Sequence, residues 1–165
     1  MSGQLSYSYQ TPKGVAGGLL DISPYAIDSR INGEEEYGAL KFGMGAVQGD
    51  NPGVNVLIPS TSSAASDFEG VVLTGFTQMM NTEGAANIAP LQTVGILRWG
   101  RAWVRLADGI TPVYGESLYL IKTGDDAGLF TNDSGGGANF AVNGRFIGGL
   151  GSGDIAPVEI YNQKP

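Results

Sequence analysis

Residues Thr93 to Phe130 read TVGILRWGRAWVRLADGITPVYGESLYLIKTGDDAGLF, and this stretch decides the fold class. It holds three short runs rich in β-branched and aromatic residues, each closed by Gly, Asp or Pro. Runs bounded in this way predict β-strands. Only Gly100 and Arg101 separate the first two runs, and a glycine at the first central position of a two-residue loop favours a type II′ turn. The sequence therefore predicts a β-hairpin centred on these two residues.

The register of this hairpin sorts its side chains into two faces. The face expected to point into the core carries Leu97, Trp99, Ala102, Val104 and Leu106. The opposite face carries Ile96, Arg98, Trp103 and Arg105. This register would place Arg98 across from Trp103, where an exposed cation–π contact is worth about 0.5 to 1 kcal/mol. This outer face is either a contact surface or the side of an ordinary amphipathic hairpin that meets water or a neighbouring strand.

Length and composition predict one β-domain. A chain of 165 residues fits a single domain and buries about 70% of its unfolded surface, which is enough for a core without disulfides or metals. Glycine makes up 27 of the 165 residues, far above the usual share of about 7%. Because 42% of the residues are hydrophobic, the extra glycines are expected in turns and bulges rather than in a disordered polymer.

The inventory of reactive side chains excludes most kinds of catalysis. The chain has no cysteine and no histidine, which removes disulfides, thiolate chemistry, Ser-His-Asp and Cys-His mechanisms and every zinc site that needs those ligands. Paired carboxylates remain, as in glycosidases, but no pair stands out on converging strands. The run DDAGLF after Gly124 lacks the alternating oxygens of a calcium loop. We therefore predict no catalytic residue, no metal and no cofactor.

The charge balance argues against nucleic acids and membranes as partners. The formal charge is −7 and the pI is about 4.4, and no local basic patch offsets the repulsion from phosphate groups. The first ten residues, MSGQLSYSYQ, lack the basic and apolar regions of a signal peptide, and no apolar run approaches the roughly 18 residues of a membrane span. We expect a soluble product made in the cytoplasm.

Residues 1–38 are predicted to form an extended N-terminal arm, followed by a β-barrel-like domain over residues 39–165. The arm lacks a sustained period of 2 or 3.6, and prolines and glycines interrupt it. Its apolar anchors include Tyr7, Tyr9, Leu19, Leu20 and Tyr25. Such a segment cannot bury these anchors by itself, so it lies across its own barrel or across another subunit. The alternative is a first strand with loops packed on the same domain.

The remaining strands are predicted from alternation and turn residues. They cover residues 39–47, 54–58, 70–77, 117–122, 139–149 and 155–161. Residues 59–67 read as an exposed polar loop, and residues 78–90 as a loop rather than one short helical turn. The expected fold class is all-β.

The order of several segments resembles a known family. They are DFEGVVLTGF (67–76), VGILRWGRAWVRL (94–106), VYGESLYLIKTGDDAGLF (113–130), NFAVNGRFIGGL (139–150) and VEIYN (158–162). This order is similar to that of the phage capsid cement, or head decoration, proteins, over roughly residues 67–161. Gly115 and Glu116 stand where that family has Gly-Asp.

The resemblance implies a compact β-barrel-like domain, β-tulip or SH3-like, that binds the outside of a phage head and clamps adjoining major capsid subunits. It implies synthesis in the host cytoplasm, no catalytic residue and a homo-oligomer, with a trimer favoured because closed symmetry suits a symmetric lattice. The residues predicted to contact the capsid or a second subunit are Tyr7, Tyr9, Leu19, Leu20, Tyr25, Arg98, Trp103 and Arg105.

A carbohydrate-binding β-module is the alternative function. In that case Trp99, Trp103, Tyr114 and Tyr119 would supply stacking platforms for sugar rings. The predicted register argues against this alternative, because it assigns Trp99 to the core and leaves only Trp103 facing outward.

Overall fold

The structure is a computed structural model that describes residues 14–75, 79–80, 86–148 and 154–161. The described elements are eleven strands and two short 3₁₀ helices. They are β1 (Ala26–Asn32), β2 (Gly45–Gln48), β3 (Asn55–Leu57), η1 (Ala65–Asp67), β4 (Phe68–Val72), β5 (Met79–Met80), β6 (Ala86–Asn87), β7 (Thr93–Arg105), β8 (Ser117–Leu120), β9 (Phe130–Thr131), η2 (Gly135–Gly137), β10 (Phe140–Phe146) and β11 (Ile155–Tyr161). The predicted all-β class is confirmed. None of the described helices is long and apolar enough to cross a membrane.

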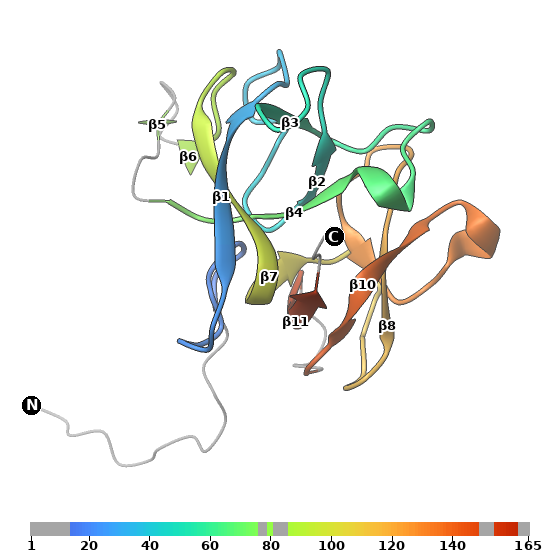
Figure 1. The fold of residues 1–165 in the computed structure, drawn as a ribbon. Helices are drawn as coiled ribbons and strands as arrows, with labels where there is room; N and C mark the ends of the chain where they lie inside the picture. The colour runs from blue at the N-terminus through green and yellow to red at the C-terminus, as the bar shows by residue number, and fades with distance from the viewer. Residues whose placement is uncertain (1–13, 76–78, 81–85, 149–153, 162–165) are drawn as a thin grey trace, which may run out of the picture.

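Five strands close into a barrel. Their order is β1-β3-β2-β4-β7, and β7 pairs with β1 to complete the ring. A ring of five strands cannot alternate in direction all the way round, and the one parallel pairing joins β1 to β3. The barrel interior holds a buried cluster of Leu40, Ala46, Val56, Val72, Ile88, Val94 and Ile96. Figure 1 shows β1 and β7 running side by side.

The predicted hairpin at Gly100 and Arg101 is wrong. Thr93–Arg105 is one continuous strand of 13 residues, β7. Its first half pairs with β1 from Thr93 to Trp99, and its second half pairs with β11 from Trp99 to Arg105. The seven-residue ladder to β11 passes straight through the expected turn and gives its backbone groups partners. Arg98 therefore does not lie across from Trp103.

Gly100 marks a break in the alternation of β7. Leu97 and Ala102 are five residues apart, which would put them on opposite faces of a regular strand, yet both belong to one buried cluster. Gly100 lies between them with a φ of +132°, a conformation that side chains other than glycine rarely adopt. A Cβ there would also lie 2.8 Å from the Cβ of Tyr25. The break at Gly100 thus keeps both halves of β7 in contact with the same buried cluster.

The second core lies between the wall of the barrel and the strands that continue beyond it. From β7 the sheet extends through β11, β10 and β8 to β9, so the nine strands form one sheet. Figure 1 shows β8, β10 and β11 gathered on the side of β7 away from β1. The cluster includes Phe68, Leu97, Ala102, Val104, Leu106, Phe130, Phe146 and Ile160. The predicted core positions at Leu97, Ala102, Val104 and Leu106 are therefore confirmed. Trp99, predicted for the same face, is half-buried and belongs to neither buried cluster, and Ile96, predicted for the opposite face, is buried inside the barrel.

Other predicted strands are confirmed with changed bounds. β11 covers the predicted 155–161, whereas the strand expected at 70–77 lies at Phe68–Val72. Residues 78–90, predicted as a loop, include β5 and β6, which pair with each other. Residues 26–32 of the predicted arm form β1 and therefore belong to the barrel. The division of the chain at residue 38 stays a prediction.

Candidate interaction surface

Residues 14–25, called the strap here, lie along the second half of β7. The backbone N–H of Gly17 donates to the carbonyl of Trp103 (2.8 Å), and the N–H of Trp103 donates to the carbonyl of Gly18 (2.9 Å). The N–H of Leu20 donates to the carbonyl of Arg101 (3.0 Å). The strap therefore pairs with the same edge of β7 as β1 does, but with the second half of the strand instead of the first.

Two glycines let the strap approach its own domain closely. Gly17 has a φ of +78°, and a Cβ there would lie 2.7 Å from both the backbone nitrogen of Thr74 and the carbonyl oxygen of Val72. Gly14 lies against the indole of Trp103, where a Cβ would overlap the ring. As a result Trp103 is only 3% exposed. Its side chain belongs to neither buried cluster, so the strap is what covers it.

A polar network fastens the strap to the sheet. Arg101 on β7 pairs with Asp21 of the strap (Nη1 to Oδ2, 3.0 Å) and with Glu159 on β11 (Nε to Oε1, 3.0 Å). Glu159 also pairs with Arg145 on β10 (3.0 Å) and accepts a hydrogen bond from the hydroxyl of Tyr161. One nearly buried carboxylate therefore holds two arginines in place, and one of these holds the strap.

The carboxylates of this network prefer their charged form. Hydrogen bonds from the side chain and the backbone of Ser23 lower the pKa of Asp21, and Arg101 adds to the effect. The hydroxyl of Tyr161 is the main cause that lowers the pKa of Glu159, with Arg101 and Arg145 adding to it against the opposing effect of burial.

The outward side of the strap is apolar. Ile22 is fully exposed and Val15 is 65% exposed. Continuing into the start of β1, the large exposed apolar side chains are Val15, Leu19, Ile22, Tyr25 and Ile27. Five such side chains within one short segment, on a domain that already has two buried cores, form a candidate contact surface.

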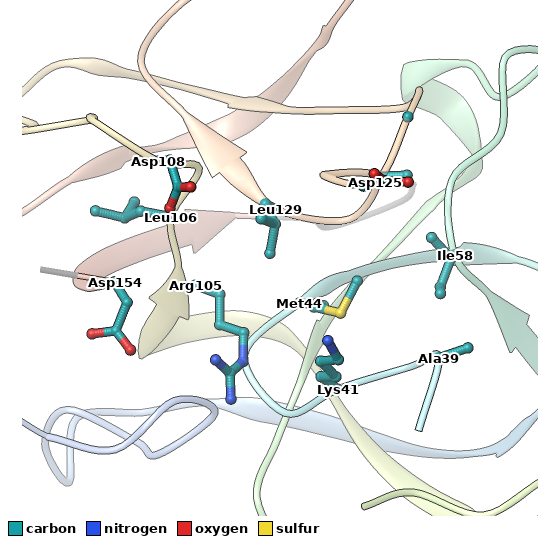
Figure 2. Close-up of a pocket in the computed structure, with 12 residues that line it drawn as sticks. Ala39, Lys41, Met44, Ile58, Arg105, Leu106, Asp108, Asp125, Leu129 and Asp154 are labelled. Carbon is teal, nitrogen blue, oxygen red and sulfur yellow. The ribbon is translucent and has the colours of Figure 1, made fainter. Parts of the chain in front are cut away.

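A hollow of about 330 Å³ opens between the start of β2, the end of β7 and the loops beside β9. Figure 2 shows Lys41 and Arg105 on the same side of this hollow. The residues that line it are Ala39, Lys41, Met44, Ile58, Arg105, Leu106, Asp108, Gly124, Asp125, Ala127, Leu129 and Asp154. In the described part of the chain, no group of three or more acidic side chains is placed to hold a metal ion.

Comparisons with known proteins identify the family. The model of one family, described as "Structural cement protein (E217 gp24/Pam3 gp6)", matches residues 4–161, which is nearly the whole chain. This chain belongs to the structural cement protein family. Its role is structural, in the phage capsid.

The fold of the cement protein is also found in a solved capsid. A chain from the capsid of Myoviridae phage XM1 is similar with a TM-score of 0.72 and 18% sequence identity. The match covers 97% of the cement protein and 98% of that chain. No curated protein matches the chain.

The structure places three of the predicted contact residues of the cement protein on the strap. Leu19 and Tyr25 belong to the exposed apolar side, and Leu20 is half-buried. Tyr7 and Tyr9 lie outside the described residues. That these residues touch the capsid or a second subunit stays a prediction.

The other three predicted contact residues are not together on one open face. Arg98 forms an ion pair with Asp28 of β1 (3.0 Å). Arg105 is half-buried and lines the hollow. The prediction that Trp103 faces outward is wrong, because the strap covers it.

Sequence analysis missed Asp21, Glu159 and Lys41. Asp21 and Glu159 meet Arg101 across 80 and 58 residues of chain, and no local pattern signals such a contact. Lys41 carried a weak signal, since it is the one cation in the apolar, glycine-rich run ALKFGMGAV.

We expect acid to loosen the strap. The pKa values of Asp21 and Glu159 are lowered in the folded protein, so their contribution is complete above their ordinary values of 3.8 and 4.5 and is lost as the pH falls through the lowered ones. In a Trp99→Phe variant, acrylamide quenching of Trp103 fluorescence should therefore rise below about pH 4.

The variant Asp21→Asn is the control for this prediction, since it should raise the quenching of Trp103 at neutral pH without any acid. Circular dichroism monitors the barrel in parallel. Quenching that stays constant in acid while the barrel remains folded would contradict the role of the network.

Proposed function

We propose that this cement protein binds the outer surface of an assembled phage head and bridges neighbouring major capsid subunits, and that it does so as a trimer made in the host cytoplasm. The observation that carries the proposal is the apolar outward side of the strap, with Ile22 fully exposed. Burying a Val, Leu or Ile side chain is worth about 1.5 to 3 kcal/mol, so this surface favours a partner over water.

The net charge of the protein and the repeated geometry of a capsid lattice also favour a structural contact with a protein shell. The net charge of −7 disfavours packaged nucleic acid as the partner. When a protein touches several subunits of one lattice, its weak contacts add together. Once one contact has formed, the others form at a high effective concentration. Closed cyclic symmetry of the cement protein would match local symmetry axes of the head.

The structure weakens the carbohydrate-binding alternative. A stacking platform needs an open aromatic face, and the indole of Trp103 is covered by Gly14 of the strap. Tyr114 is exposed, but the guanidinium of Arg145 lies 5.6 Å from the centre of its ring. No observation favours a sugar over a protein partner.

The test uses purified protein and undecorated capsids of the same phage. We expect the protein to sediment with the capsids and to raise the temperature at which the shell melts in calorimetry. Sedimentation velocity of the free protein tests the trimer. If the protein neither binds the capsids nor changes their melting, the proposed function is wrong.

A further inference from the structure

The hollow presents two cations on one wall. Arg105 comes from the last position of β7, and Lys41 from the segment before β2. The Nε of Arg105 donates to the carbonyl of Phe42 (2.8 Å), which fixes the direction of the guanidinium. Figure 2 shows both side chains on the same side of the hollow, across from Leu129 and Asp125. The guanidinium of Arg105 is therefore held in place before any partner arrives, whereas Lys41 is exposed.

Lys41 and Arg105 differ from the other arginines of the described chain in their ion pairs. Each of the others pairs with a carboxylate: Arg30 and Arg98 with Asp28, Arg101 with Asp21 and Glu159, and Arg145 with Glu159. By contrast, neither Lys41 nor Arg105 forms an ion pair with any described residue. In a protein of net charge −7, carboxylates are plentiful, so two cations that form no ion pair among the described residues and line the same hollow mark a site for an outside anion.

The charges on the other walls argue against a free ion as the occupant. Asp108, Asp125 and Asp154 also line the hollow, and Figure 2 shows Asp125 on the far side from Arg105. The carboxylates of Asp108 and Asp125 repel a small anion that enters alone. They accept a polypeptide segment whose acidic side chain points at the cations and whose amide or basic groups face the rim. Apolar side chains such as Met44, Ile58 and Leu129 line the space between.

We propose that the hollow binds one acidic side chain of a neighbouring major capsid subunit, with its carboxylate held between Lys41 and Arg105. This inference rests on the proposed function and names a second contact beside the strap. Because the guanidinium of Arg105 is already fixed by Phe42, little freedom of that side chain is lost on binding. The contact is electrostatic, so it weakens as salt is added.

The test compares the affinity of charge variants for undecorated capsids. Lys41 is exposed, so Lys41→Glu removes one cation and adds a repelling charge without disturbing a buried contact. Its affinity should fall about 10- to 100-fold, with a weaker dependence on salt than that of the unchanged protein. Arg105→Gln should give a similar loss. Because it also removes the bond to Phe42, its folding is checked by thermal melting.

Lys122→Glu is the matched control. It makes the same change of charge at a lysine outside the hollow, whose Nζ is 3.5 Å from the carbonyl of Ser63. Its affinity should stay within about twofold of the unchanged protein.

The outcomes separate this inference from the proposed function. If the unchanged protein binds capsids and Lys41→Glu binds as tightly, the inference is wrong and the proposed function stands. If Lys41→Glu alters self-association of the free protein instead, the occupant is a second copy of this chain and the assignment to a capsid subunit is overturned. If the unchanged protein does not bind capsids, both proposals fail.

Discussion

Replacing Phe130 by alanine is expected to lower the free energy of unfolding by about 3 to 5 kcal/mol. Phe130 is completely buried in the second core, although it lies on β9, a strand of only two residues. Its ring meets that of Phe68 edge to face, with centroids 6.5 Å apart. Removing the ring leaves a cavity that the closely packed sheet cannot fill by relaxing. Urea denaturation followed by circular dichroism measures the loss.

Val113→Ala is the control for this prediction. Val113 is 62% exposed, so its truncation should change the stability by no more than about 0.5 kcal/mol. If Phe130→Ala costs less than about 1 kcal/mol, the second core is not packed around this ring as described.

Deleting residues 1–24 is expected to weaken binding to undecorated capsids by at least about 100-fold while the barrel stays folded. The deletion stops before Ala26, where β1 begins, because β1 closes the barrel. The strap contributes Val15 and Ile22 to the proposed contact, and burial of two such side chains is worth about 3 kcal/mol, or two factors of ten. Surface plasmon resonance on immobilised capsids measures the change.

A double variant, Val15→Ser with Ile22→Ser, separates the apolar contact from the presence of the strap. Both side chains are largely exposed, so the folded state should lose little stability while the affinity falls by about 100-fold. A truncated protein that binds capsids undiminished removes the strap from the interface. A truncated protein that no longer unfolds cooperatively shows instead that the strap is needed for the fold.

Local pattern was sufficient where a segment is short and its alternation is regular. The predicted bounds of β11 agree with Ile155–Tyr161, and Ala102 and Val104 lie in the core as their spacing indicates. The hairpin failed because a two-residue loop that begins with glycine and a glycine bend inside one strand look alike in sequence. What decides between them is the partner, β11, which lies about 50 residues further along the chain.

The candidate surface was likewise predicted only in part, because its remaining contacts join residues far apart in the chain. Apolar residues such as Leu19 and Tyr25, in a segment without periodicity, indicated a surface that needs covering. Neither the burial of Trp103 under the strap nor the pairing of Asp21 with Arg101 is encoded in neighbouring residues. Both arise when the strap folds back on β7, and the same holds for Lys41 and Arg105 at the hollow.

A cryo-EM map of capsids decorated with the purified protein tests the central claim most directly. The account predicts ordered density on the outside of the shell that touches at least two neighbouring major capsid subunits, with Val15 and Ile22 of the strap buried and an acidic side chain beside Arg105. A map in which the protein touches a single subunit, or in which the strap faces away from the shell, would contradict the account.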